Sequence, residues 1–209
     1  MKPALLLAHG WALDRTLWDR VLEALGEDAD GAVVRDAGYY GRPADPVVKG
    51  AVLGVGQSLG ALELLAEPPE GLVGVVALDG FARFGRAADF PEGVPARVLE
   101  RMKARIGDGG LAEFVERAGG QLSEGEPDPE RLIAGLGRLH ALDGRACPLP
   151  VWRLHAEGDP IASLAMADAS FASMTVVERR VRPSTDHLSP LTAPHACAEL
   201  IRAALKAVA

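Results

Sequence analysis

The stretch that decides the fold is "VLGVGQSLGALELL", residues 52–65. A short apolar run ends at Gly56, Ser58 follows two residues later, Gly60 comes next, and a helical pattern of apolar residues then begins. The pentapeptide GQSLG therefore matches the pattern G-x-S-x-G in the context of a strand followed by a helix. We expect a turn so sharp that a side chain at either glycine would collide with neighbouring backbone. Such a turn lifts the serine above the sheet at the N-terminus of a helix.

A serine in this position needs two partners before the motif indicates chemistry, because small residues also occur at ordinary strand-to-helix turns. A serine hydroxyl is a poor nucleophile unless a histidine takes its proton and a carboxylate orients that histidine. In α/β proteins that carry their serine on such a strand-to-helix turn, the chain order is serine, acid, histidine. Asp159 in "VWRLHAEGDPIAS" and His187 in "VRPSTDHLSP" each follow a predicted strand, at the sheet edge where α/β sites form. The sequence therefore predicts Ser58, Asp159 and His187 as a catalytic triad.

The other histidines fit the role of base less well. His9 precedes Gly10 at the end of the first strand, and we expect it to be a structural part of the loop that binds the oxyanion. His155 ends a strand and is expected to be a buried histidine whose hydrogen bonds are satisfied. His140, in a helical insertion, and His195, at the start of the last helix, are expected at the surface.

Asp79 is the rival for the acid, because a carboxylate one strand earlier can reach the same histidine. Asp159 is preferred, since it lies in a "GDP" turn after the later strand. Asp186, directly before the histidine, is expected to point elsewhere.

A developing oxyanion needs a pair of donors, usually backbone amides, and losing one costs roughly 3 kcal/mol in comparable sites. The sequence predicts the amide of Leu59, directly after the nucleophile at a helix N-terminus, as one donor. The other is the amide of Trp11 in "HGWALD", where Gly10 allows the loop to turn back toward the serine. The Trp11 indole is then expected to be free to form an apolar wall beside the ester.

Composition excludes several other classes of protein. The chain has 209 residues, which suits one domain, and its net charge of −7 argues against nucleic acid as a partner. The apolar run at 4–8 is too short for a signal peptide, and no segment approaches the ~20 apolar residues that span a bilayer. Cys147 and Cys197 lack metal-ligand spacing and are expected to be buried free thiols. We expect a cytoplasmic protein without metal or cofactor.

The order of elements predicts a mostly parallel sheet of about six strands flanked by helices. The connection at 36–50 is rich in glycine and proline, so we expect little helix there and one thinly covered sheet face. Residues 82–148 break the alternation with three helical patterns, near 94–106, 110–118 and 129–142. We expect a core of 1–81 and 149–209 with a helical cap, 82–148, that serves as a lid. The six predicted strands cover residues 3–8, 32–35, 51–55, 72–78, 151–155 and 175–181.

The segments "LLLAHGWALDRTLW", "GQSLGALELL", "LHAEGDPI" and "DHLSPLTAPHACAELI" together resemble the α/β-hydrolase superfamily. Within it the chain is similar to the pimeloyl-[acyl-carrier protein] methyl ester esterases of biotin synthesis, on the "HGW" setting, Trp18 and the stretch 132–145. The resemblance implies the same triad and the same two oxyanion donors. Two departures stand out: the family's two strands before the "HG" strand are expected to be absent, and Gln57 stands where that group often has an aromatic residue.

The insertion bears on the substrate. Between Phe81 and Ile106 there are six basic and three acidic residues, and Arg97, Arg101 and Arg105 recur every four residues on one helix face. Such a face either is simply solvated or steers an acidic acyl-carrier protein toward the pocket. The apolar residues of the same region, Phe81, Phe84, Phe90 and Met102, are expected either to form an acyl pocket, with Phe81 and Phe84 contacting substrate beside Trp11, or to be plain core packing.

These features predict a serine carboxylic-ester hydrolase that acts through an acyl-enzyme. Two alternatives stay open at this point. One is a hydrolase of the same fold acting on another small ester, a thioester, a lactone or a carbon–carbon bond. The other is a non-catalytic binding module that has kept the fold.

Overall fold

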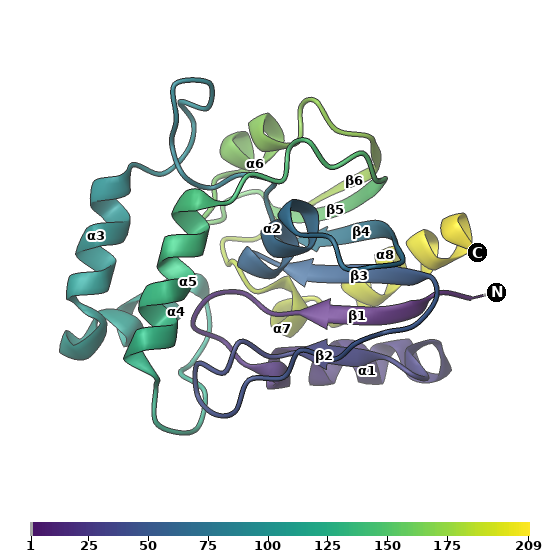
Figure 1. The fold of residues 1–209 in the computed structure, drawn as a ribbon, viewed down its shortest axis with the longest axis horizontal. Helices are drawn as coiled ribbons and strands as arrows, with labels where there is room; N and C mark the ends of the chain where they lie inside the picture. Colours follow the sequence, from purple (N-terminus) through teal and green to yellow (C-terminus); the bar gives the residue numbers. More distant parts are fainter. Residues whose placement is uncertain (1) are drawn as a thin grey trace.

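The computed structural model, which describes residues 2–209, contains one six-stranded sheet in the order β2-β1-β3-β4-β5-β6. Every neighbouring pair of strands is parallel (Figure 1). Each of the six strands predicted from the sequence is present, which confirms the predicted fold class. The strands are β1 (Ala4–Ala8), β2 (Val33–Arg35), β3 (Val52–Gln57), β4 (Leu72–Leu78), β5 (Val151–Ala156) and β6 (Val176–Arg182).

Helices cover both faces of the sheet, so its central strands are apolar on both sides. Alternate residues of β1 belong to different clusters: Leu5 and Leu7 pack with α1 (Asp19–Leu25) and α8 (Pro194–Val208). Leu6 of the same strand packs on the opposite face with side chains of α2 (Leu59–Ala66). The remaining elements on the sheet are α6 (Leu164–Ser170), α7 (Ser189–Thr192) and the short 3-10 turns Arg15–Trp18 and Gly26–Ala29.

The connection between β2 and β3 contains no helix in the described chain, as its glycines and prolines predict. A polar hollow of about 300 Å³ lies at this point, lined by residues of the connection, of β2, of α2 and of the cap. Its charges are paired, for example Arg35 with Asp45 at 2.7 Å. All three residues of β2 are only partly buried, in keeping with the thin cover expected on this side of the sheet.

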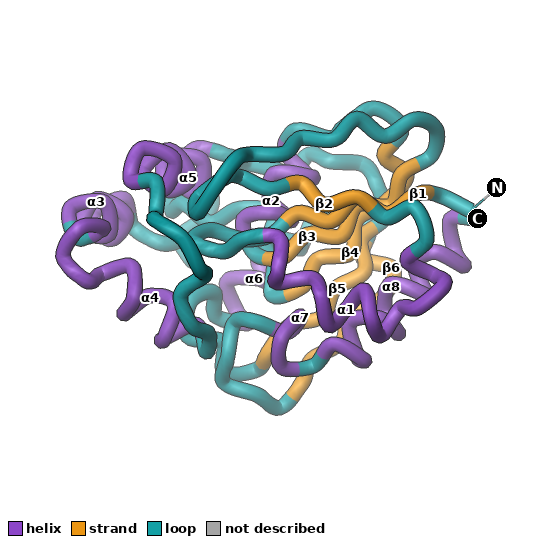
Figure 2. The backbone as a smooth tube through the Cα atoms, turned by 90° about the horizontal axis from the view of Figure 1, so that it is seen from below, coloured by secondary structure: helices purple, strands orange, loops and turns teal. Residues whose placement is uncertain are grey.

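Three helices lie between β4 and β5 and form the predicted helical insertion: α3 (Ala96–Ala104), α4 (Leu111–Ala118) and α5 (Pro129–Ala141). A single π-type turn, Ile106–Gly110, joins α3 to α4. Figures 1 and 2 both place these helices beyond the C-terminal ends of the strands. Their apolar faces form one cluster with core residues that include Trp11, Leu59 and Phe81. The insertion is thus packed directly on the loops where β1, β3 and β4 end.

Cys147 and Cys197 are both buried and free, which confirms the prediction from their spacing. Within residues 2–209, no helix combines the length and the apolar character that crossing a bilayer requires.

At Gly60, the helix α2 passes too close to the end of β1 to leave room for a side chain. A methyl group at Gly60 would lie 2.1 Å from the carbonyl oxygen of Ala8, a backbone atom that has no room to move. We expect Gly60→Ala to lower the free energy of unfolding by about 2 kcal/mol or more, as overpacked cores do. Urea denaturation measures this as a lower midpoint at unchanged slope.

A matched control is Gly137→Ala, because Gly137 lies in α5 and the added methyl group would have no heavy atom within 4 Å apart from its chain neighbours and its own helix backbone. We expect that variant to be stabilised by about 0.5–1 kcal/mol, since alanine is the better helix former. Equal stability of the two variants would contradict the steric argument.

Candidate active site

The turn between β3 and α2 carries Ser58 in a backbone conformation that side chains rarely adopt. Its φ is 52° and its ψ is −119°. A methyl group at Gly56 would lie 2.3 Å from the amide nitrogen of Ala61, and one at Gly60 would meet Ala8. Both glycines of the pentapeptide are therefore required by close backbone approach. The strained turn places Ser58 directly before the first residue of α2, as predicted.

His187 lies in the loop between β6 and α7 and contacts both predicted partners. The Ser58 hydroxyl lies 2.8 Å from His187 Nε2, and His187 Nδ1 lies 2.6 Å from Asp159 Oδ2. All three residues are buried, with exposed fractions of 7%, 2% and 6% for Ser58, His187 and Asp159. In this arrangement Nδ1–H donates to the carboxylate, and the serine hydroxyl donates to Nε2. The structure thus joins three residues that are far apart in the sequence.

Asp159 follows β5, and its carboxylate accepts hydrogen bonds at both oxygens. Oδ1 accepts from the amides of Ile161 and Ala162 at 2.8 and 2.9 Å. Oδ2 accepts from His187 and also lies 3.3 Å from His155 Nε2. Burial alone would raise the pKa of the Asp159 carboxyl, but the hydrogen bonds from His155 and His187 outweigh it and hold the pKa well below its ordinary value. The carboxylate is therefore ionised at neutral pH.

His155 has a larger role in this site than its sequence context suggests. It is buried with its Nε2–H directed to the carbonyl of Ala162 at 2.8 Å, as expected of a satisfied core histidine. The same nitrogen also reaches Asp159, so two imidazoles share one carboxylate oxygen. Burial alone would lower the pKa of His155, but the hydrogen bond to Asp159 and the nearby charge of Asp79 raise it above its ordinary value. The four-residue spacing in "HAEGD" was the only signal in the sequence.

Asp79, the rival acid, holds backbone rather than an imidazole. Its carboxylate is fully buried and accepts from the amides of Ala156 and Ser189, at 3.2 and 2.7 Å. Burial raises the pKa of Asp79, although positive charge on His187 and His155 would lower it in part. Asp79 thus links the end of β5 to the start of α7, and the second of these contacts fixes the backbone just after His187.

The Asp186 carboxylate bonds other partners than Ser58 or the His187 ring, as expected, and forms an ion pair with Arg182. It also accepts from the hydroxyl of Ser184 and from the amide of Leu188, which closes the histidine loop.

The remaining histidines lie where the sequence placed them. His9 is buried at the end of β1, with Nδ1 2.8 Å from the carbonyl of Gly10 and Nε2 accepting from the amide of Ala37 at 3.1 Å. His140 and His195 are exposed.

The two predicted oxyanion donors border the serine. A methyl group at Gly10 would lie 2.9 Å from Ser58 Cβ, so the loop that carries Trp11 passes directly beside the Ser58 side chain. Leu59 is the first residue of α2, where amides have no intrahelical acceptor. Neither amide donates to a protein acceptor among residues 2–209. Both are available to a bound atom.

The Trp11 side chain corrects one expectation. Its indole is not free, because Nε1–H donates to the carbonyl of Leu132 in α5 at 2.8 Å. Its ring also contacts the Phe114 ring edge-on, with centroids 4.8 Å apart. The ring still lines the pocket, so the apolar wall is present but is fastened to the insertion.

A cavity of about 750 Å³ opens at Ser58 between the core and the insertion. Phe84 and Met102 line it, whereas Phe81 and Phe90 do not. Phe81 therefore follows the alternative of core packing: its side chain is fully buried and packs behind Phe84, with ring centroids 4.7 Å apart. The other apolar lining residues are Trp11, Val94, Val98, Leu99, Phe114, Leu139, Pro160 and Ile161, and the charged ones are Arg105, Glu113, Glu116 and Arg117.

One cluster among the described residues has the composition of a metal site: Asp79, His155 and Asp159, whose donor atoms lie within 4.8 Å of one another. Its carboxylate oxygens are already occupied by backbone amides and by imidazole N–H groups. A cation there would have to displace those donors, so the cluster fits the orientation of His187 better than metal binding.

The depressed pKa of Asp159 predicts how its contribution to stability depends on pH. A carboxyl group whose pKa is lower in the folded state stabilises the fold at every pH above its pKa in the unfolded chain. This stabilisation is lost as the pH falls through the pKa of the folded state. We expect Asp159→Asn to lower the free energy of unfolding by about 3 kcal/mol at neutral pH. The difference from wild type should begin to shrink below about pH 4. Urea denaturation across pH measures it.

Asp28→Asn is the control, since Asp28 forms only exposed pairs with Lys2 and Arg202. We expect that variant to change the free energy of unfolding by less than about 1 kcal/mol at any pH. A difference for Asp159→Asn that stays constant with pH would show that its ionisation is not coupled to folding.

In sequence, the chain is similar to the biotin biosynthesis bifunctional protein BioHC of Cellvibrio japonicus, at 27% identity over 204 residues. The match covers 80% of this chain and 40% of that protein, so the chain spans well under half of this relative. No protein-family model matches the chain.

In structure, the chain is similar to a thermophilic esterase from Thermogutta terrifontis, with a TM-score of 0.72 at 23% identity over 99% of this chain and 90% of that one. An enol-lactonase from Burkholderia xenovorans gives a TM-score of 0.75 at 16% identity, over 99% of this chain and 92% of that one. An esterase from Exiguobacterium antarcticum gives a TM-score of 0.72 at 14% identity, over 98% of this chain and 92% of that one. With its parallel sheet and its serine turn between β3 and α2, the chain has the α/β-hydrolase fold that these structures share.

Proposed function

We propose that this protein is a serine carboxylic-ester hydrolase that acts through an acyl-enzyme. One observation carries the proposal: the Ser58 hydroxyl lies 2.8 Å from His187 Nε2, and His187 Nδ1 lies 2.6 Å from Asp159, at the wall of an apolar cavity. The three groups have the order and the contacts that nucleophilic catalysis by serine requires.

The proposed reaction begins when Ser58 Oγ attacks the ester carbonyl carbon while its proton passes to His187 Nε2. The tetrahedral oxyanion accepts hydrogen bonds from the amides of Trp11 and Leu59. The bond from the carbonyl carbon to the alcohol oxygen then breaks, and Nε2 returns the proton to the departing alcohol. Water repeats the sequence on the acyl-enzyme and releases the acid. Asp159 stays ionised throughout and stabilises the imidazolium, so this route calls for no metal or cofactor.

The cavity favours an ester with an extended apolar acyl group. Most of its lining is apolar, and its volume of about 750 Å³ lies within the range of small-molecule sites. Similarity to a biotin biosynthesis protein supports a methyl ester of a carrier-bound pimeloyl group as the substrate. The charged residues among the lining, such as Arg105 and Arg117, suit the polar end of such a molecule better than its hydrocarbon chain.

We also propose that an acidic acyl-carrier protein docks on α3. Val98, Leu99 and Met102 of this helix line the cavity, while Arg97 and Arg101 are exposed and have no ion-pair partner among residues 2–209. Arg105 lies one residue past the helix and is already paired with Glu113 at 2.7 Å. Arg97 and Arg101 are therefore the cations best placed to attract an acidic partner toward the pocket.

Hydrolysis of p-nitrophenyl esters of increasing acyl length, beside methyl esters of carrier-bound diacids, tests the reaction. We expect turnover by the wild type, covalent labelling of Ser58 by a fluorophosphonate, and a loss of roughly 10⁴-fold or more in kcat for Ser58→Ala. Ser173→Ala, at an exposed serine outside the cavity lining, should match the wild type. A wild type that neither labels nor turns over any ester would favour the non-catalytic binding module.

Charge reversal on α3 tests the docking surface. We expect Arg97→Glu with Arg101→Glu to lower kcat/KM on a carrier-bound ester by roughly tenfold, through slower association, while sparing a p-nitrophenyl ester. The control is Arg42→Glu with Lys49→Glu, which changes the net charge equally at two exposed residues of the connection between β2 and β3. Equal loss on both substrates, or equal effects of the two double variants, would exclude docking on α3.

A further inference from the structure

Two hydrogen bonds join the helical insertion to residues of the candidate active site. The amide of His187 donates to the carbonyl of Ala118, the last residue of α4, at 2.9 Å. The indole of Trp11 donates to the carbonyl of Leu132 in α5 at 2.8 Å. One bond holds the backbone of the proposed base, and the other holds the residue whose amide is a proposed oxyanion donor.

The end of α4 is shaped to lie against the histidine loop. Two glycines follow the helix: a methyl group at Gly119 would lie 2.8 Å from Asp186 Cβ, and one at Gly120 would lie 2.6 Å from Leu188 Cδ1. Asp186 and Leu188 flank His187 on either side. The chain leaving α4 therefore contacts all three residues of the loop that presents the imidazole.

The helix α5 is fastened to the core at three points. A methyl group at Gly135 would lie 2.4 Å from the Tyr39 hydroxyl and 2.7 Å from Trp11 Cδ1, so the helix backbone passes directly over both rings. The Tyr39 carbonyl accepts from the amide of Asp128, the residue that caps α5, at 2.8 Å.

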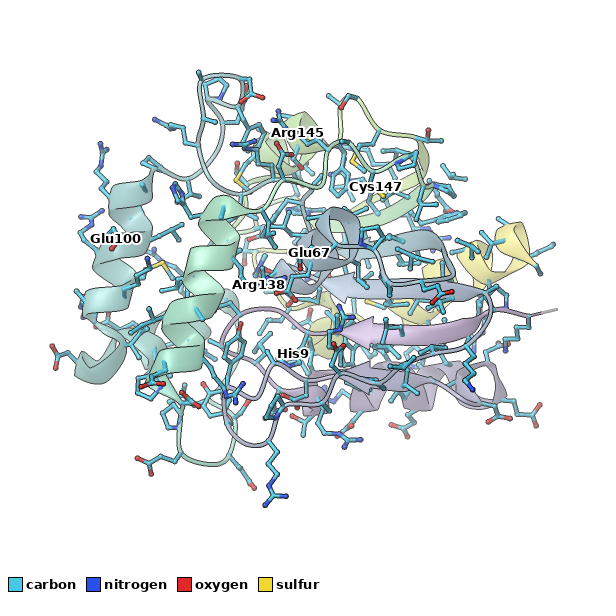
Figure 3. All side chains as sticks on the ribbon, in the orientation of Figure 1. His9, Glu67, Glu100, Arg138, Arg145 and Cys147 are labelled. Atoms are coloured by element: carbon cyan, nitrogen blue, oxygen red, sulfur yellow. The ribbon has the colours of Figure 1, made fainter. Side chains whose placement is uncertain are left out.

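The third point is an ion-pair cluster. Arg138 of α5 pairs with Glu63 of α2 and with Glu67 just beyond it. Figure 3 shows Arg138 and Glu67 facing one another between the two helices. Because α2 begins at the residue after Ser58, α5 is tied to the helix that carries the nucleophile as well as to the loop of Trp11.

We propose that α4 and α5 position the catalytic groups, so that the arrangement of base and oxyanion donors exists only while these helices are seated on the core. The inference rests on the proposed hydrolase function. Leu132 and Ala118 act through Trp11 and His187 and are positioning residues. Displacing α5 would release the Trp11 ring, and with it the peptide group whose amide must face the oxyanion. Small misplacements of this kind lower kcat more than they alter binding.

Two glycines of α5 provide the experiment. Gly135→Ala inserts a methyl group against Trp11 and Tyr39 outside the cavity lining, whereas Gly137→Ala places the same group in open space. We expect Gly135→Ala to lower kcat on a p-nitrophenyl ester roughly tenfold or more, with KM nearly unchanged. Gly137→Ala should retain the wild-type kcat. Thermal unfolding establishes that both variants are folded at the assay temperature.

Two tryptophans provide a second pair. Trp11→Phe removes the indole donor to Leu132 and keeps the backbone amide, while Trp18→Phe removes a buried indole that has no hydrogen-bond partner. We expect Trp11→Phe to lower kcat and Trp18→Phe to leave kcat at the wild-type value. This pair decides the matter if Gly135→Ala does not fold.

The outcomes separate the two proposals. An active wild type in which each variant matches its control in kcat overturns the positioning role and leaves the hydrolase proposal intact. A rise in KM without loss of kcat in both Gly135→Ala and Trp11→Phe would show that the two changes affect only substrate binding at the pocket wall, and this also overturns the positioning role. A wild type without esterase activity or fluorophosphonate labelling overturns both.

Discussion

The structure depends first on the close passage of two backbones at the turn between β3 and α2. Gly56 lies against the amide of Ala61, and Gly60 lies against the carbonyl of Ala8, so neither position has room for a Cβ atom. This contact sets α2 on the sheet and forces Ser58 into a left-handed φ of 52°. The strain is maintained because β3 is buried in the centre of the sheet and α2 is buried against it. The serine therefore stands at the C-terminal edge of the strands, where the other loops converge.

Around that serine, a buried network of acids and imidazoles fixes the base. Asp159 receives two backbone amides on one oxygen and two imidazoles near the other, which keeps it ionised despite burial. Asp79 adds a second buried carboxylate, which links the end of β5 to the start of α7, directly after the histidine loop. Buried polar groups are costly unless they are paired, and here each pairing also orients His187. The same interactions thus stabilise the fold and align the proposed proton relay.

The helical insertion completes the site rather than merely covering it. It supplies most of the cavity wall, and it contributes carbonyl groups that accept from Trp11 and His187. A shared fold does not by itself fix a substrate, because the chemistry on it is set by the residues of the site. In this chain the insertion contributes most of the apolar lining of the cavity, from α3 to α5. The same insertion therefore both lines the cavity and holds two residues of the candidate site.

The sequence by itself determined the six strands, the three helices of the insertion, the serine turn and the choice of Ser58, Asp159 and His187 as neighbours. These follow from local causes: the period of apolar residues, the two glycines that only a tight turn requires, and the rule that parallel strands end at one edge. Tertiary structure alone decided that the Trp11 indole binds Leu132, 121 residues away, that Phe81 packs behind Phe84, and that His155 reaches Asp159. Such contacts form only when segments that are distant in the sequence pack against one another. The sequence around each of these side chains would allow several contact partners, so only the packing of the whole chain decides which contact forms.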